Sequence, residues 1–465
     1  MANGARRARI RAALLIFAAA SAGCGPSAEI ASLTPSEVMS VSAWLTASVT
    51  GAMSARAIAT EPDGRAVRTP DLPLLGDGVT VALLGLAPDT DYQVVVEAVP
   101  ASGEAVASKP MAFHTGSLPS GLPVLTAQNG GIDRGALTLL GVVNVGGASH
   151  AAMIADADGR VVWYHVTDRP VTDFQRQPDG TYTACEIGPV TPPAPERCDQ
   201  FDREGRLLRI WTAPPESPAT DTHELRILDG GDALLMGSQA HPADFSAVGG
   251  SASAQAMGQV VYRLGPGGEQ RFRWSAFDHL AFDDVDPAVL LSQDPVDWTH
   301  ADAVSQTADG NYLVTFRNLS QVVKIDAATG AILWRLGGRR SSFTFPDDPL
   351  VGPSFQHGAR ELPDGHILLF DNGNGRPTRQ SRAVEYALDL QRMEARVAWQ
   401  YAPAAPAWAA DFGFAQRLPN GNTLVSLGSL ARVEEVTPAG QVVWSVESPN
   451  AGLGIYRAIR IDTLY

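Results

Sequence analysis

The stretch TADGNYLVTFRNLSQVVKIDAATGAILW, residues 307–334, has two glycine turns between short β-branched runs and ends on a tryptophan. A glycine turn between two such runs is typical of a β-hairpin, so two turns in one unit indicate four strands. The same order recurs six times along the chain, which predicts an all-β fold with a six-bladed β-propeller. The tryptophans that end equivalent strands are Trp163, Trp211, Trp274, Trp334, Trp399 and Trp444.

Turn sequences recur at similar positions before and after the repeated tryptophans. Most tryptophans follow a glycine turn, whereas Trp399 follows a longer connection without glycine. After most of them comes a second hairpin signal. The first set comprises DADGRVVW, DREGRLLRIW, GPGGEQRFRW, DAATGAILW and TPAGQVVW, and the second comprises RQPDGTYTA, RILDGGDALL, QTADGNYLV, ELPDGHILL and RLPNGNTLV.

The two ends of the repeat region complement each other. The last strand, within 455–465, follows Trp444 and has no partners after it, whereas the strands within 137–165 lack an inner strand before them. Joining them completes the sixth blade and leaves no open sheet edge. We therefore expect the C-terminal strand to close the ring.

Residues 28–116 read as a separate domain of short alternating strands. A strand, the corner LAPDTDY (86–92), a valine-rich strand and a closing strand together resemble a fibronectin type III β-sandwich. In that arrangement the Tyr92 hydroxyl bonds back to the chain. We expect this domain to be a spacer or docking module, followed by a linker at 117–123 and a catalytic propeller at 124–465.

The first residues read as an export signal. RRARIR (6–11) is basic, AALLIFAAA (12–20) is apolar but too short to span a bilayer stably, and SAGC ends at Cys24. SAGC resembles a bacterial lipoprotein cleavage box with serine in place of the usual leucine; an ordinary signal peptidase site is the alternative. We expect a signal peptide at 1–23, lipidation of Cys24 and a periplasmic or cell-envelope location. The membrane would be contacted only through this anchor.

Two further cysteines, Cys185 and Cys198, flank a loop rich in proline and polar residues. In an oxidising compartment this pair is expected to form a disulfide. A metal pair is less favoured, because no further cysteine or histidine with ligand spacing lies nearby.

Three histidines occupy equivalent places in consecutive repeats. His223, His300 and His357 each lie at the start of the strand that follows a tryptophan, which is the innermost strand of a propeller blade. A single histidine there is most often a structural hydrogen-bonding group, but three in one ring would face one funnel. The other blades supply aromatic residues and an arginine at this place: Phe174, Phe412, Phe414, Tyr456 and Arg457.

Two kinds of chemistry use such a cluster. Three imidazoles can hold zinc or iron. Arg317, which ends the strand paired with that of His300, would repel a divalent cation but would bind a sulfate or phosphate. The arginine favours the anion site.

The segments DWTHADAV (297–304), LVTFRNLSQVVKIDAATGAILWRLGG (313–338) and FQHGARELPDGHILLFDNGNGR (355–376) resemble the bacterial aryl-sulfate sulfotransferases. The resemblance covers nearly all of residues 120–465 and implies an exported six-bladed propeller preceded by a β-sandwich. It also implies a ping-pong reaction, independent of nucleotide sulfates and of metal or other cofactors. A phenolic sulfate gives its sulfuryl group to a histidine, and a phenolic acceptor then takes it.

The resemblance also implies roles for individual residues. His357 corresponds to the covalent nucleophile, His300 and Arg317 to the groups that hold the sulfuryl oxygens, and His223 to a further histidine from the preceding blade. The aromatic residues could stack on the aryl rings. One departure is Asp302, where the family often has asparagine, since a carboxylate there would repel sulfate unless it faces away or pairs with Arg317.

Other functions remain open. The net charge of −15 argues against a nucleic-acid partner. IDAATGAILW (325–334) resembles a quinoprotein repeat, but it is the one clean copy, and the cysteine pair and metal-binding acids of such enzymes are missing. A non-catalytic binding scaffold is the remaining alternative.

Overall fold

The computed structural model describes residues 25–144, 150–188, 196–403, 407–450 and 452–465. The expected signal peptide and Cys24 lie outside these residues. The described chain is all-β, apart from short helical turns, and none of its helices has the length and hydropathy to cross a bilayer. The turns are η1 (Ser246–Val248), α1 (Ala276–His279), η2 (Phe282–Asp284), η3 (Arg317–Leu319) and η4 (Gly428–Leu430).

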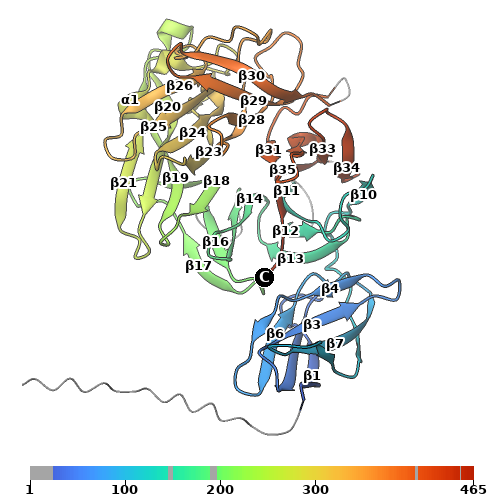
Figure 1. Ribbon diagram of the computed structural model, residues 1–465. Coiled ribbons are helices and arrows are strands. Elements are labelled where there is room, and N and C mark those ends of the chain that lie inside the picture. Colours follow the sequence, from blue (N-terminus) through green and yellow to red (C-terminus); the bar gives the residue numbers. More distant parts are fainter. Residues whose placement is uncertain (1–24, 145–149, 189–195, 404–406, 451) are drawn as a thin grey trace, which may run out of the picture.

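Within the described residues, strands β10 to β35 form six sheets that lie in a ring around a common centre (Figure 1). We number these sheets blades 1 to 6. Blade 1 contains β35 (Leu453–Ile461), β11 (Leu137–Asn144), β12 (His150–Ala155) and β13 (Val161–Thr167). Blade 2 contains β14 (Val171–Arg176), β15 (Tyr182–Glu186), β16 (Arg197–Phe201) and β17 (Leu207–Trp211). Blade 3 contains β18 (Ala219–Ile227), β19 (Ala233–Ala243), β20 (Ala254–Leu264) and β21 (Gln270–Ser275), with β22 (Val296–Asp297) paired to β20.

Blades 4 to 6 follow the same plan. Blade 4 contains β23 (Ala301–Gln306), β24 (Tyr312–Phe316), β25 (Gln321–Ile325) and β26 (Ile332–Gly337). Blade 5 contains β27 (His357–Glu361), β28 (Ile367–Asp371), β29 (Arg382–Asp389) and β30 (Glu394–Tyr401). Blade 6 contains β31 (Phe414–Arg417), β32 (Thr423–Ser426), β33 (Arg432–Val436) and β34 (Val442–Glu447), and β10 (Thr126–Asn129) adds to its outer edge.

The C-terminal strand closes the ring. β35 pairs antiparallel with β11, from Leu137 opposite Ile461 to Asn144 opposite Leu453. The inner strand of each blade contacts the inner strand of the next blade, and the last contacts the first. In order around the ring these strands are β14, β18, β23, β27, β31 and β35. The predicted closure and the predicted inner position of the strand after each tryptophan are therefore confirmed.

The recurring tryptophans tie neighbouring blades together. The indole N–H of Trp163 donates to Arg203 O of blade 2, at 2.8 Å. Trp274 of blade 3 donates to Gly330 O of blade 4 at 3.0 Å, and Trp444 of blade 6 donates to Ala157 O of blade 1 at 2.8 Å. Each acceptor lies in an outer hairpin turn, so the repeat preserves a contact between blades as well as a core residue.

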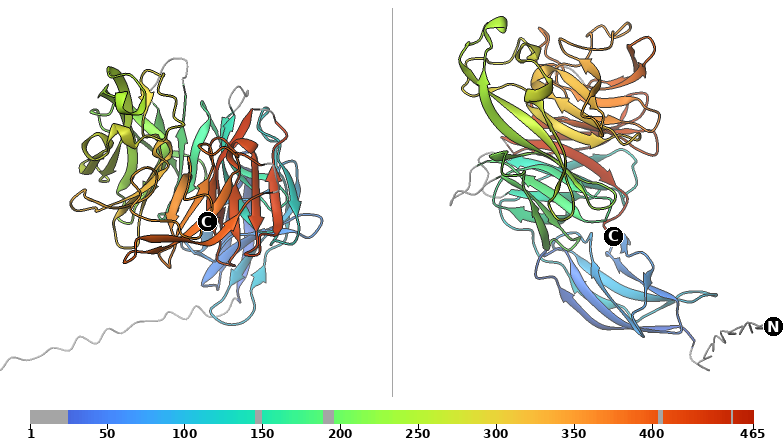
Figure 2. Two further views of the ribbon diagram at one scale, coloured as in Figure 1. Left: turned by 90° about the horizontal axis from the view of Figure 1, so that it is seen from above. Right: turned by 90° about the vertical axis from the view of Figure 1, so that its left-hand side faces the viewer.

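The N-terminal domain is built from two sheets around a shared apolar core (Figure 2). The Tyr92 hydroxyl accepts the N–H of Ala87 at 2.8 Å, which confirms the expected bond back to the chain. One sheet contains β1 (Ser27–Pro35), β2 (Ala43–Thr50) and β6 (Gly78–Leu83). The other contains β3 (Ser54–Thr60), β4 (Ala66–Arg68), β5 (Leu72–Pro73), β7 (Asp91–Val99), β8 (Val106–Ala107) and β9 (Met111–His114).

This domain packs on blade 1 beside the C-terminus (Figure 1). Arg160 of blade 1 donates to both oxygens of Glu61, at 2.8 and 3.0 Å. The hydroxyl of the last residue, Tyr465, accepts the N–H of Leu84 at 3.0 Å. The C-terminal residues that follow the closing strand β35 therefore also contact the N-terminal domain.

The expected disulfide is present. Cys185 on β15 and Cys198 on β16 face each other across the strand pair and are bonded. Both are buried in an apolar cluster with Trp211. The bond joins two neighbouring strands of blade 2 at a sequence separation of 13, rather than distant parts of the chain.

Candidate functional site

The inner strands bulge at one end. β14, β18, β23, β27 and β35 each lose register with the adjoining strand near their N-terminal ends. Bulges re-aim side chains and are common beside active sites. The residues that fall in the register shifts include His223, Asp302, Gly358 and Tyr456.

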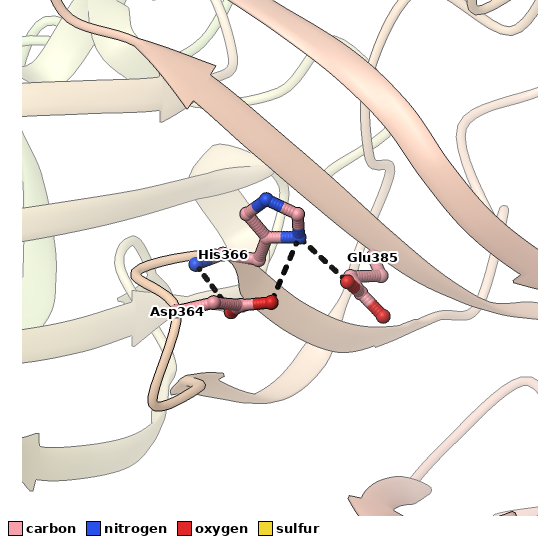
Figure 3. Close-up of side chains that lie close together, drawn as sticks. All are labelled: Asp364, His366 and Glu385. Atoms are coloured by element: carbon pink, nitrogen blue, oxygen red, sulfur yellow. Dashed lines mark hydrogen bonds and ion pairs between the residues drawn. The ribbon is translucent and has the colours of Figure 1, made fainter. Parts of the chain in front are cut away.

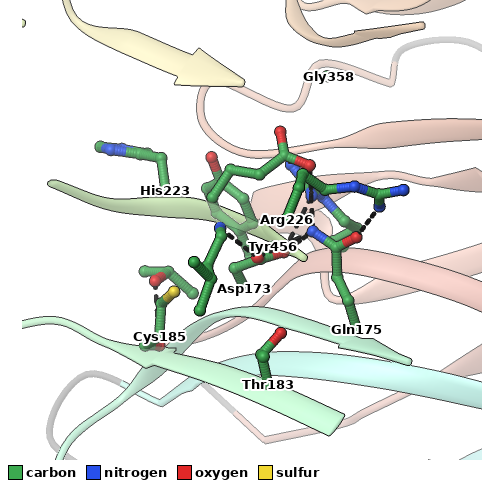
Figure 4. Close-up of polar contacts among 12 residues, drawn as sticks. Asp173, Gln175, Thr183, Cys185, His223, Arg226, Gly358 and Tyr456 are labelled. Carbon is green, nitrogen blue, oxygen red and sulfur yellow. Dashed lines mark hydrogen bonds and ion pairs between the residues drawn. The ribbon is translucent and has the colours of Figure 1, made fainter. Parts of the chain in front are cut away.

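The structure brings the three predicted histidines together around Tyr456. The rings of His223 and His300 lie 5.0 Å apart between centroids. The ring of Tyr456 lies 5.8 Å from that of His223 and 6.3 Å from that of His357. Phe412 packs on the same tyrosine at 5.3 Å. Figure 4 shows His223 and Tyr456 with Gly358, the residue after His357.

The hydrogen bonds of His357 define its tautomer. Its Nδ1 lies 2.7 Å from Oδ1 of Asn372, whose Nδ2 donates to the carbonyls of Ala409 and Phe412, both at 2.8 Å. Because the amide must present its oxygen to the ring, Nδ1 carries the proton and Nε2 keeps its lone pair. Burial, together with Arg317, holds the pKa of His357 well below its usual range. The ring is therefore a neutral imidazole at pH 7, with its lone pair on Nε2.

The other two histidines have carboxylate partners. His223 Nδ1 lies 2.6 Å from Asp221, and His300 Nδ1 lies 2.5 Å from Asp297. Burial opposes protonation of His223, but Asp221 outweighs it and raises the pKa of His223 to about 9. His223 is therefore an imidazolium at pH 7, able to give a proton.

Arg317 lies at the mouth of the site. It donates to Asn318 at 2.9 Å and to Asp411 at 3.0 Å, and its guanidinium lies 5.1 Å from the centre of the Phe355 ring. Its backbone N–H donates to the carbonyl of His300 at 2.9 Å. Arg317 and His300 line one pocket of about 380 Å³, a size that suits a small aromatic ligand.

Asp302 is buried between the catalytic candidates and is not paired with Arg317. Its Oδ1 accepts the N–H of Gly358 at 3.1 Å, and its backbone carbonyl accepts the Tyr456 hydroxyl at 3.0 Å. Burial raises the pKa of Asp302 to about 8, so the carboxyl is largely neutral at pH 7. Asp302 is therefore not paired with Arg317, and its neutral form would not repel an anion.

Two sequence-predicted ligand contacts lie elsewhere. Phe174 is fully buried and stacks on Trp163 at 5.5 Å, in the core between blades 1 and 2. Its neighbour Asp173 faces the centre of the ring instead, where Arg457 donates to it at 2.9 Å (Figure 4). The expectation that Phe174 and Arg457 contact the ligand is not met.

Arg457 and Phe414 belong to the packed centre of the ring. Arg457 also donates to Glu224 at 2.8 Å and lies over the Phe414 ring at 4.9 Å. A Cβ at Gly358 would come within 2.5 Å of that ring, and the φ of Gly358 is +63°. Phe414 therefore supports the backbone next to His357 and is not one of the exposed contacts of the site.

The partners Asn372, Asp221 and Asp297 were not identified from the sequence. Asn372 stands in DNGNGR (371–376), which reads as a turn. Asp221 lies two residues before His223, and Asp297 lies three residues before His300. This short spacing is the sequence signal that could have identified the two aspartates as partners of the histidines. The tautomer of a histidine is set by such partners.

A compact group of possible metal ligands lies away from these histidines. Among the described residues, Asp364, His366 and Glu385 are the group of three whose ligand atoms lie within 4.8 Å of one another (Figure 3). Glu385 is also bonded to Arg417. The Nδ1 atoms of His223, His300 and His357 are already bonded to Asp221, Asp297 and Asn372, an arrangement that offers a metal only their Nε2 atoms.

Comparison with known proteins gives one family match. The family model described as Arylsulfotransferase (ASST) matches residues 203–449. A search of the curated proteins gives no match. Among solved structures, a protein of unknown function from Bacteroides caccae has 15% identity over 71% of this chain and 100% of that chain, with a TM-score of 0.45. A catalytically inactive virginiamycin B lyase from Staphylococcus aureus has 9% identity over 70% and 76% of the two chains, with a TM-score of 0.30.

Proposed function

Because the chain belongs to the arylsulfotransferase family, we propose that it moves a sulfuryl group from a phenolic sulfate ester to a phenolic acceptor through a sulfohistidine at His357. The observation that carries the proposal is the combination of a neutral imidazole with a free Nε2 at His357 and a protonated imidazole at His223. Transfer between phenolic oxygens needs a nucleophile and an acid of this kind in one site.

In the first half-reaction, the Nε2 lone pair of His357 forms a bond to sulfur. The bond between sulfur and the phenolic oxygen breaks, and its electron pair stays on that oxygen. His223 gives its proton to the departing oxygen, so the phenol leaves and His223 becomes neutral. Asn372 accepts the Nδ1–H of the ring and stabilises the positive charge that forms there.

In the second half-reaction, the acceptor phenol gives its proton to His223 while its oxygen attacks the sulfur. The nitrogen–sulfur bond breaks, and the electron pair returns to Nε2 of His357. Arg317 and His300 hold the sulfuryl oxygens throughout by charge-assisted hydrogen bonds. Tyr456 and Phe412 contact the aryl ring, and no cofactor takes part.

The remaining features of the chain complete the proposal. The two-sheet domain is a fibronectin type III-like spacer at residues 28–116, joined by the 117–123 linker to the catalytic propeller at 124–465. The protein is exported to the periplasm or cell envelope and is anchored through lipidated Cys24. Its partners are the small-molecule donor and acceptor.

The proposed reaction is tested with 4-nitrophenyl sulfate as donor and phenol as acceptor, in the presence of a chelator. We expect sustained release of nitrophenol that depends on phenol, together with phenyl sulfate detected by mass spectrometry. Release without an acceptor product would indicate hydrolysis instead. Activity that is lost on prolonged chelation and restored by zinc would favour the three-histidine metal site.

The charge of Asp302 predicts a pH dependence. Its pKa of about 8 means that the carboxyl is neutral below pH 8 and becomes a carboxylate above it, where it repels the sulfuryl oxygens. Adduct formation from 4-nitrophenyl sulfate without acceptor should therefore slow by about tenfold between pH 7 and pH 9. In Asp302→Asn the decline should shrink to the contribution of His223, whose pKa of about 9 leaves about half of it without its proton at pH 9, while the rate at pH 7 is retained. An unchanged decline in Asp302→Asn, or loss of the rate at pH 7, would contradict repulsion by the Asp302 carboxylate as the cause of the decline. The control is Asp364→Asn, a substitution at an exposed residue.

A further inference from the structure

The pocket beside His300 and Arg317 contains a second arginine, Arg379. Two aromatic residues, Phe355 and Trp408, line the same pocket of about 380 Å³. Arg317 lies over Phe355 at 5.1 Å, and Arg379 lies over Trp408 at 4.5 Å. The pocket therefore has two cationic groups, each placed on an aromatic ring.

The acidic residues of this pocket are already bonded to other groups. Asp297 is bonded to His300 and Asp411 to Arg317. Arg379 is different, because no carboxylate lies within 4.0 Å of it among the described residues, although every other charged side chain of the pocket is ion-paired. A cation without an acidic partner, in a pocket that already holds the groups for one sulfate, fits a second negative charge on the ligand.

Trp408 is held in place beneath Arg379. Its indole N–H donates to Oδ1 of Asn374 at 3.0 Å, and Asn374 Nδ2 donates to the carbonyl of Ala410 at 2.8 Å. Arg379 is exposed, and the cation–π contact with this fixed aromatic face holds its guanidinium at the rim of the pocket. Its free N–H groups match a planar carboxylate.

We propose that this pocket selects aryl sulfates whose ring carries a carboxylate, with Arg379 as the residue that recognises it. The inference rests on the proposed function and adds the class of donor. The sulfate lies at Arg317 and His300. The edge of the ring that bears the sulfate keeps its contacts with Tyr456 and Phe412. The opposite edge lies between Phe355 and Trp408, where its carboxylate meets Arg379. Arg379 takes no part in bond making, so a donor without a carboxylate should react equally well with or without it.

The test compares 4-sulfooxybenzoate with phenyl sulfate as donors. In Arg379→Gln, kcat/KM for the carboxylated donor should fall about threefold to fivefold, as expected for an exposed charge pair, while that for phenyl sulfate stays unchanged. For Arg379→Lys, kcat/KM for the carboxylated donor should lie between the values of the wild type and of Arg379→Gln, because lysine keeps the positive charge but lacks the planar guanidinium that binds a carboxylate with two hydrogen bonds. Added salt should weaken the preference of the wild type. Arg392→Gln, an exposed arginine outside the pocket, should leave the ratio unchanged.

A binding measurement separates this inference from the proposed reaction. Calorimetric titration with 4-hydroxybenzoate should show tighter binding than with phenol, and Arg379→Gln should remove the difference. Equal binding of both phenols to the wild type, or an equal loss for both donors in Arg379→Gln, would overturn the inference. If neither donor is turned over but the carboxylate preference in binding persists, the proposed transfer fails and the pocket assignment stands.

Discussion

His357→Asn should form no covalent adduct and should have no measurable transfer activity. In the wild type, incubation with an aryl sulfate and no acceptor should add the mass of one sulfuryl group to the protein. The substitution removes the Nε2 lone pair, and without the nucleophile the two-step route has no first step. Intact-protein mass spectrometry measures the adduct, and nitrophenol release measures turnover.

His223→Asn is the matched control. A group that gives a proton typically contributes about 10²–10⁴-fold, so this variant should still form the adduct, more slowly. The deficit should be smaller with 4-nitrophenyl sulfate than with phenyl sulfate, because the better leaving group needs its proton less. An adduct that persists in His357→Asn would move the nucleophile elsewhere, with His300 the next candidate.

Arg457→Met should strongly destabilise the propeller. Arg457 is 1% exposed and pairs with Asp173 and Glu224, which are both fully buried. Removing one partner of a buried ion pair leaves an uncompensated charge, at a typical cost of about 3–5 kcal/mol. Unfolding in guanidinium chloride, followed by tryptophan fluorescence, should show a clearly lower midpoint.

The exposed substitution Arg392→Met serves as the control, with an expected change within about 0.5 kcal/mol. Adding Asp173→Asn to Arg457→Met should recover part of the loss, because Asp173 is the carboxylate left without a cation, whereas Glu224 keeps its ion pair with Arg360. Equal midpoints for Arg457→Met and the wild type would mean that the central ion cluster does not stabilise the ring.

The amino-acid sequence determined the repeat and much of the site. Glycine turns and tryptophans are local signals, and their sixfold recurrence left few architectures besides a closed ring. The unpaired strand after Trp444 matched the strand missing before residue 137, so the closure followed from counting. His223, His300 and His357 could be placed together because equivalent strand starts in a ring lie on one face.

The tertiary structure decided which way individual side chains point and which charges they carry. In β14 a bulge between Val171 and Asp173 sets the phase of the strand, so Asp173 faces the centre and Phe174 enters the core. A register shift of one residue exchanges the two faces of a strand. No local sequence pattern indicated the bulge in β14. The proton on Nδ1 of His357 depends on Asn372 from the neighbouring strand end, and the neutral form of Asp302 depends on burial at the centre of the ring. Asn372 meets His357 across one hairpin of blade 5, whereas the burial of Asp302 comes from several blades. Neither effect could be read from the sequence, because hydrogen bonding and desolvation act through space rather than along the chain.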